Sequence, residues 1–165
     1  VVGGGFGGAT AARYLKRLLP SAEVSLVEPN EEYVSCPFSN LVISGLRELS
    51  AQIFNHDALS REGIRLVRAM ATDVGATSKT VTLSTGDKLP FDRLVMSPGI
   101  GFRRHALEGY GEGTARVMPH AWKAGPQTIL LQQQLKLLLL PHRLDQKLSR
   151  TRRRAPFGGA RGPRR

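Results

Sequence analysis

Three glycines near the start of the chain, Gly3, Gly5 and Gly8, have the spacing G-x-G-x-x-G. They follow an apolar pair, Val1 and Val2, and open a stretch with helical periodicity. In such a loop the first glycine permits a sharp turn, the second lets the backbone approach a pyrophosphate, and the third allows close helix–strand contact. The free amides and the positive dipole end of the helix then face the phosphates. The spacing therefore predicts a dinucleotide-binding loop.

A carboxylate follows the glycine loop at the spacing expected for a ribose-binding residue. Glu28 lies 20 residues after Gly8, at the end of the second predicted strand. A carboxylate at that place accepts hydrogen bonds from a ribose diol. Glycine-rich turns without ligands are common, but the preceding strand, the following amphipathic helix and Glu28 together favour dinucleotide binding. The pattern alone does not choose between a flavin and a nicotinamide dinucleotide.

A second turn follows a short apolar strand late in the chain. Residues 93–96 (RLVM) form that predicted strand, and Ser97, Pro98 and Gly99 follow it directly. On turn chemistry alone these three residues could equally form a generic turn. In many flavoproteins with two dinucleotide domains, however, a β-meander precedes a short strand that ends in a small-residue turn. A meander predicted just before this strand therefore favours FAD, with Ser97, Pro98 and Gly99 near the flavin.

The single cysteine, Cys36, lies in the stretch YVSCPFSN. Pro37 suits the first turn of a helix, so the thiol is expected just outside a helix N-terminus. The helix dipole and free amides would stabilise a thiolate there, which is the form that acts as a nucleophile. By composition alone, a lone cysteine is more often a small buried apolar residue. Both interpretations stay open at this point.

The elements that position these residues alternate between strands and helices, which predicts an α/β fold. We expect a doubly wound, Rossmann-like FAD-binding parallel sheet with an inserted β-meander, in an incomplete form. The predicted strands are 1–3, 23–28, 64–67 and 93–96, the meander is 72–76, 80–84 and 88–91, and the helices are 7–19, 37–44, 51–62 and 128–140.

Charge divides the chain into two parts. Residues 1–125 hold 14 Lys and Arg and 12 Asp and Glu, whereas residues 126–165 hold 10 basic residues and one acid. No apolar run approaches the roughly 20 residues of a membrane-spanning helix. One cysteine and four scattered histidines exclude an intramolecular disulfide and the usual zinc motifs. The first three quarters of the chain therefore resemble an ordinary soluble domain.

Several stretches together resemble the flavoprotein subunit of flavocytochrome c sulfide dehydrogenase, a family related to the sulfide:quinone oxidoreductases. Besides the glycine loop these are ATAARYLKRL, SLVEPN, YVSCPFSN, LVMSPGI, LEGY and PHAWKAG, and they cover about residues 1–135. The resemblance implies FAD-dependent oxidation of sulfide in the periplasm, with electrons passed to a c-type cytochrome subunit. It also implies that FAD is bound covalently, through a thioether to Cys36. It gives His120 and Trp122 no specific role.

The resemblance stops after about residue 135. The family has a redox disulfide in a second domain, whose cysteines are not among these residues, so we expect no sulfide oxidation by residues 1–165 alone. Accordingly, we interpret 1–127 as an FAD/NAD(P)-binding-type domain, 128–140 as a helix entering a second domain, and 141–165 as a basic, disordered or frameshifted tail. Arginine, proline, alanine and glycine have GC-rich codons, which is typical of a GC-rich gene read out of frame.

Two alternative functions stay open, the second of them from another class of protein. The first is an NAD(P)H-linked flavoprotein disulfide reductase of the same superfamily. The placement of Cys36 in Tyr-x-x-Cys, rather than in a cysteine pair on a helix, argues against it. The second is a basic nucleic-acid-binding module formed by residues 141–165, in which Phe157 is the only aromatic residue that could stack on a base.

Overall fold

A parallel sheet lies at the centre of the fold. The computed structural model describes the backbone of residues 1–154 and the side chains of residues 1–140. Strand β1 (Ser25–Val27) pairs in parallel with β4 (Arg65–Val67), and Val2 forms parallel bridges to both Val27 and Met96. The order across the sheet is therefore the Met96 segment, the Val2 segment, β1 and β4. This is the order of a doubly wound sheet, as predicted.

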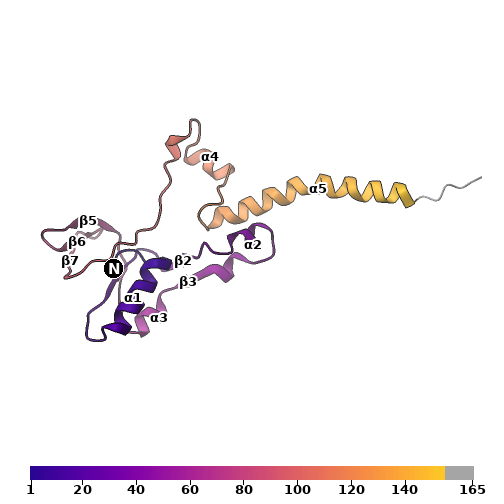
Figure 1. Cartoon of the computed structure of the whole chain (residues 1–165). Coiled ribbons are helices and arrows are strands. Elements are labelled where there is room, and N and C mark those ends of the chain that lie inside the picture. The colour runs from indigo at the N-terminus through magenta and orange to yellow at the C-terminus, as the bar shows by residue number, and fades with distance from the viewer. Residues whose placement is uncertain (155–165) are drawn as a thin grey trace, which may run out of the picture.

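Two helices pack against β1. The alternation of small apolar and charged residues in α1 (Phe6–Leu18) gives it one apolar side, as the sequence predicted. Helix α3 (Asp57–Arg61) lies beside α1 (Figure 1), and Glu62 after it pairs with Arg13 of α1 at 3.0 Å. Between the helices and the sheet lies a buried apolar cluster, which consists of Ala12, Val24, Leu26, Leu59 and Ile64.

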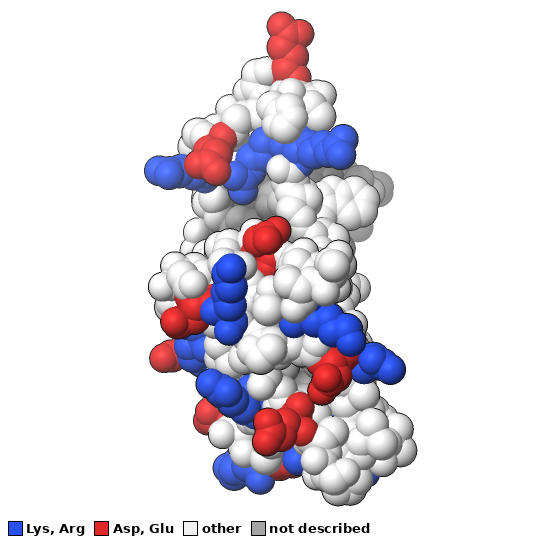
Figure 2. Space-filling view, turned by 90° about the vertical axis from the view of Figure 1, so that its left-hand side faces the viewer, with Lys and Arg blue, Asp and Glu red and all other residues white. Residues whose placement is uncertain are grey.

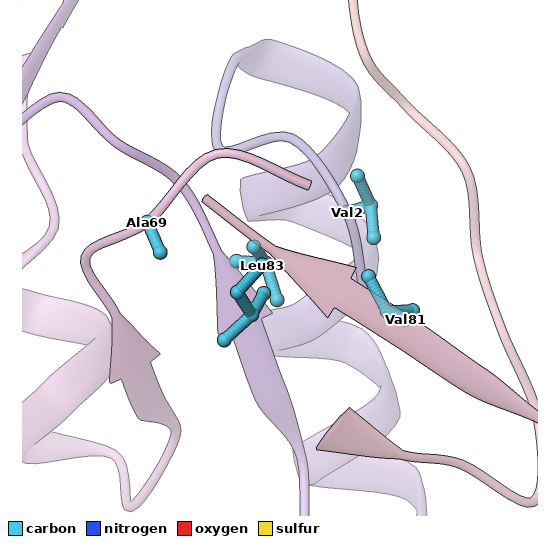
Figure 3. Close-up of a cluster of buried hydrophobic side chains, with 5 residues drawn as sticks. Val2, Ala69, Val81 and Leu83 are labelled. Atoms are coloured by element: carbon cyan, nitrogen blue, oxygen red, sulfur yellow. The ribbon is translucent and has the colours of Figure 1, made fainter. Parts of the chain in front are cut away.

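The predicted β-meander is confirmed. Strands β5 (Ala71–Gly75), β6 (Thr80–Leu83) and β7 (Lys88–Pro90) form an antiparallel sheet in chain order. Alternate side chains of β6 point into the protein, because side chains of a strand alternate between its two faces. A second apolar cluster joins the meander to the central sheet (Figure 3), and it consists of Val2, Val27, Ala69, Val81 and Leu83.

The stretch between β1 and β4 differs from the prediction. The helix predicted over 51–62 is wrong: the chain forms a 3₁₀ turn, η1 (Leu49–Gln52), then strand β3 (Ile53–Asn55), then α3. Strand β3 pairs antiparallel with β2 (Glu32–Val34), in a register that sets Tyr33 opposite Phe54. This pairing between distant segments overrides the local helical pattern, because aromatic and β-branched residues suit paired strands.

Two helices and a 3₁₀ turn follow the sheet. Residues 100–127 were predicted to be mostly loop. They contain three short pieces of helix, which are η2 (Arg104–Ala106), α4 (Glu112–Val117) and the start of α5. Helix α5 (Pro126–Arg154) packs on α2 (Ser39–Ile43), and the Gln132 amide donates to the Val42 carbonyl. No helix in the described range 1–154 is long and apolar enough to cross a membrane.

Helix α5 is longer than predicted. We expected a helix over 128–140, whereas α5 continues to Arg154. It passes through Pro141, and leucine, glutamine, lysine and arginine, which favour helix, surround that position. Residues 155–165 of the predicted tail lie outside the described residues. The interpretation of 141–165 as a basic, disordered or frameshifted tail stays a prediction.

Candidate dinucleotide-binding site

Two turns meet where the winding of the sheet reverses. The Val2 segment leads into the glycine loop, and the Met96 segment beside it leads into Ser97. The Ser97 amide donates to the Val2 carbonyl at 2.8 Å, so the two turns begin side by side. In open α/β sheets, ligands bind outside the carboxyl ends of the strands at such a reversal. The topology therefore places the glycine loop and the Ser97 turn at one candidate site.

The glycine loop is closely packed at two of its three key positions. Gly3 has a φ of +94°, and a Cβ there would lie 2.0 Å from the Ser97 carbonyl oxygen. A Cβ on Gly8 would lie 1.8 Å from the Gly3 carbonyl oxygen. The sharp turn predicted at Gly3 and the close approach predicted at Gly8 are therefore both present. A Cβ on Gly5, in contrast, would meet no atom within 4 Å.

The open space at Gly5 faces unused hydrogen-bond donors. Helix α1 makes its first backbone bond from the Ala9 amide to the Gly5 carbonyl, at 2.9 Å. The amides of residues 5–8 donate to no acceptor among the residues that the structure describes. Free amides at the N-terminus of a 13-residue helix attract anions, because the helix dipole adds to the hydrogen bonds. The loop thus has room and donors for a pyrophosphate.

Glu28 lies against the same loop. Its Oε2 accepts a hydrogen bond from the Gly4 amide at 2.7 Å, and its Oε1 accepts from the Asn30 side chain, also at 2.7 Å. Burial of the carboxyl group raises its pKa, but hydrogen bonds from the Asn30 and Gly4 amides lower it more, so the pKa of Glu28 lies below its ordinary value of 4.5. The side chain is therefore ionised at neutral pH. Oε1 also accepts from the Asn30 backbone amide at 3.0 Å, so Oε2 is the oxygen that keeps a lone pair for another donor.

The lowered pKa of Glu28 predicts how the stability of the chain changes in acid. A carboxyl group with a lower pKa in the folded state stabilises the fold above its unfolded pKa. That stabilisation disappears as the pH falls through the folded pKa. Between pH 6 and pH 3, we expect the urea midpoint of the wild-type chain to fall further than that of Glu28→Gln. Circular dichroism during urea denaturation measures the midpoint of each protein. An equal fall of the midpoint in the two proteins would show that Glu28 does not have a lowered pKa in the folded chain.

The sequence did not single out His56, which the structure places in contact with the loop. Its side chain is fully buried, and its Nε2 lies 2.7 Å from the Gly4 carbonyl oxygen. The incorrect helix over 51–62 concealed this position, because it placed His56 in mid-helix rather than between β3 and α3. Tyr33 and Phe54 are aromatic residues of a type that often pair across strands. A strand predicted at Phe54 on that ground would have placed a turn at His56.

Cys36 lies at the start of the loop that joins β2 to α2, and its side chain is exposed and free. We predicted a helix beginning at Pro37, with Cys36 just outside it, but α2 begins at Ser39. Phe38 adopts a left-handed conformation, with φ of 70°, and this turn delays the helix. Pro37 and Phe38 therefore separate Cys36 from the five-residue α2, and Cys36 does not lie directly outside the helix as predicted.

The stretch after Ser97 turns away from the sheet. Gly99 has a φ of +80°, which is typical of a glycine in a turn. Beyond it, a cavity of about 390 Å³ is lined by Phe102, Arg104 and Trp122, among others, and by none of the predicted dinucleotide-binding residues. His120 stacks on Phe102 there, with ring centres 4.3 Å apart. Burial, then the charges of Arg104 and Lys123, lower the pKa of His120.

The described surface carries mixed charge. On the face shown in Figure 2, Asp and Glu side chains lie among Lys and Arg side chains. The nucleic-acid alternative concerned residues 141–165, whose side chains lie outside the described residues. No group of three His, Cys, Asp or Glu residues suited to a metal ion occurs in the described part of the chain. The glycine loop is therefore the site that the structure supports best.

Several known flavoproteins and oxidoreductases are similar to this chain. Residues 1–135 match the family described as pyridine nucleotide-disulphide oxidoreductase. The flavoprotein chain of a flavocytochrome c sulfide dehydrogenase from Chlorobaculum thiosulfatiphilum is 64% identical over 42 residues, which are 26% of this chain and 88% of that sequence. The mitochondrial sulfide:quinone oxidoreductase of Mus musculus is 27% identical over 115 residues, which are 70% of this chain and 26% of the mouse protein.

A solved structure shares the fold. The X-ray structure of the sulfide:quinone oxidoreductase from Aquifex aeolicus superposes with a TM-score of 0.68 at 22% sequence identity. The superposition covers 84% of this chain and 31% of that one. This chain thus spans less than a third of the sulfide:quinone oxidoreductases that it matches. On the match over residues 1–135, the chain belongs to the pyridine nucleotide-disulphide oxidoreductase family.

Proposed function

We propose that residues 1–127 bind FAD and that the chain forms the FAD-binding part of a flavoprotein that oxidises sulfide. The observation that carries the proposal is the meeting of the glycine loop and the Ser97 turn at the reversal of the sheet, with free amides around an open Gly5. FAD would supply the electron-accepting ring. The residues of this chain hold and orient it.

Each predicted binding residue has a part in this proposal. The backbone of Gly3, Gly5 and Gly8 forms the pyrophosphate cradle, because two of these glycines close the turn and the third leaves space. Glu28 is ionised and accepts hydrogen bonds from the adenosine ribose hydroxyls. Ser97, Pro98 and Gly99 form the second turn against the flavin. The helix over 128–140 then leads out of the FAD-binding unit.

We infer the substrate and the electron acceptor from the names of the relatives. The relative that is 64% identical over 42 residues is named a flavocytochrome c sulfide dehydrogenase, and the mouse relative is named a sulfide:quinone oxidoreductase. We favour a c-type cytochrome as the acceptor, because the higher identity is to the flavocytochrome chain. Such a reaction would take place in the periplasm.

Replacement of Gly5 tests the FAD site. A valine side chain at Gly5 would fill the open space beside the free amides, where the pyrophosphate is proposed to lie. We expect Gly5→Val to weaken FAD binding at least about a hundredfold. This loss of affinity corresponds to about 3 kcal/mol of binding free energy. Quenching of flavin fluorescence during titration of the chain measures the affinity.

Gly113→Val is the matched control for this test. A Cβ on Gly113 also meets no atom within 4 Å, but this glycine lies in α4. We expect it to leave FAD affinity unchanged. Circular dichroism checks that both variants fold. Equal affinity of Gly5→Val and the wild-type chain for FAD would refute the proposed site.

A further inference from the structure

The carbonyl and the amide of Gly4 are both held by side chains from other parts of the chain. The Gly4 amide donates to Glu28, after β1, and the Gly4 carbonyl lies 2.7 Å from Nε2 of His56, before α3. A Cβ on Gly4 would lie 2.7 Å from both Glu28 Cγ and His56 Nε2, so the peptide fits tightly between them. The amide belongs to the 3–4 peptide and the carbonyl to the 4–5 peptide, so the two hydrogen bonds hold two successive peptide units of the loop.

The imidazole of His56 is fixed on its other edge as well. Its Nδ1 lies 3.2 Å from the Glu31 carbonyl oxygen and 3.3 Å from Nη1 of Arg68. The same Nη1 also donates to the Asn30 carbonyl. The Tyr33 ring packs on the imidazole, with ring centres 5.4 Å apart. These contacts leave the ring one orientation, with Nε2 directed at Gly4.

The chemistry of this contact requires Nε2 to carry a hydrogen. A carbonyl oxygen can only accept, so a hydrogen bond of 2.7 Å needs a donor at Nε2. That holds for the protonated imidazole and for the neutral form with its proton on Nε2. In the neutral form, Nδ1 has a lone pair that accepts from Arg68. The arrangement of partners therefore selects a donating Nε2.

The position of the Gly4 peptide determines where the next amides point. Residues 5–8 follow it directly, and their amides are the unused donors of the loop. We infer that His56 is a positioning residue of the dinucleotide site, which holds the Gly4 carbonyl so that the amides of residues 5–8 face the pyrophosphate. This inference rests on the proposed FAD function and adds a residue that acts on the ligand through the backbone.

Two substitutions of His56 separate this role from simple packing. The side-chain amide nitrogen of glutamine takes the place of Nε2 and can donate to Gly4, whereas that of asparagine takes the place of Nδ1 and cannot reach it. In titrations of the chain with FAD, we expect His56→Gln to bind within about threefold of wild type. We expect His56→Asn to bind about tenfold more weakly, the value of one hydrogen bond.

His105→Asn is the matched control, because it makes the same change at an exposed histidine of η2, outside the cluster around Gly4. We expect its FAD affinity to stay within about threefold of wild type. If His56→Asn unfolds in buffer, its titration is made in trimethylamine N-oxide, which favours the folded state without replacing the missing donor.

The outcomes are distinguishable. A wild-type chain that does not bind FAD overturns the proposed function, and this inference with it. A wild-type chain that binds FAD, with equal affinity in His56→Asn and His56→Gln, overturns the positioning role alone. Loss of affinity in His105→Asn as large as in His56→Asn also overturns it, because the loss would then not depend on the contact with Gly4.

Discussion

A single methyl group at Gly8 is expected to destabilise the folded chain strongly. The Cβ of an alanine there would lie 1.8 Å from the Gly3 carbonyl oxygen and 2.9 Å from the Gly3 carbonyl carbon. Both are backbone atoms, so no side chain can rotate away to make room. Helix α1 would have to move off the Val2 segment, and the buried Ala12 would leave its place against β1.

We expect Gly8→Ala to lower the free energy of unfolding by about 3 kcal/mol or more, at the upper end of the cost of overpacking. Gly5→Ala is the matched control, because its Cβ meets no atom within 4 Å. Gly5 is the N-cap of α1, where alanine costs about 1 kcal/mol. Urea denaturation followed by circular dichroism compares the two. Equal midpoints would show that α1 does not lie as close to Gly3 as the structure has it.

The contrast between Gly8 and Gly5 shows what a spacing pattern can predict. The pattern G-x-G-x-x-G predicted a turn at Gly3 and a close contact at Gly8, and the structure has both. These properties are local, since they depend on residues that are neighbours in the chain. The same holds for α1, and for the meander, whose turn residue Gly86 has a φ of +89°.

The residues that hold Gly4 could not be predicted in the same way. His56 reaches the loop only because β3 pairs with β2, and that pairing joins segments about 20 residues apart. A helical pattern over 51–62 concealed the strand, since short apolar stretches suit a helix or a strand equally well. The first turn of α2 also depends on the left-handed Phe38, which no residue type in the stretch demands.

Cys36→Ser is expected to abolish covalent attachment of flavin to the chain. The prediction rests on the resemblance to flavocytochrome c sulfide dehydrogenase, and the structure adds that the thiol is exposed and free to react. Serine has nearly the same shape, but a hydroxyl is a far weaker nucleophile than a thiolate. The substitution therefore removes the thioether and leaves the glycine loop unchanged.

Acid precipitation of the FAD-loaded chain measures this effect. We expect flavin to stay with the precipitated wild-type protein and to appear in the supernatant for Cys36→Ser. Before precipitation, both proteins should bind FAD through the glycine loop, because the pyrophosphate cradle lies in residues 3–8 and Cys36 follows β2. Gly5→Val should carry neither covalently attached nor released flavin. Flavin that is fully released from the wild-type chain, with Gly5→Val still unable to bind, would mean that Cys36 has no covalent role while the dinucleotide site stands.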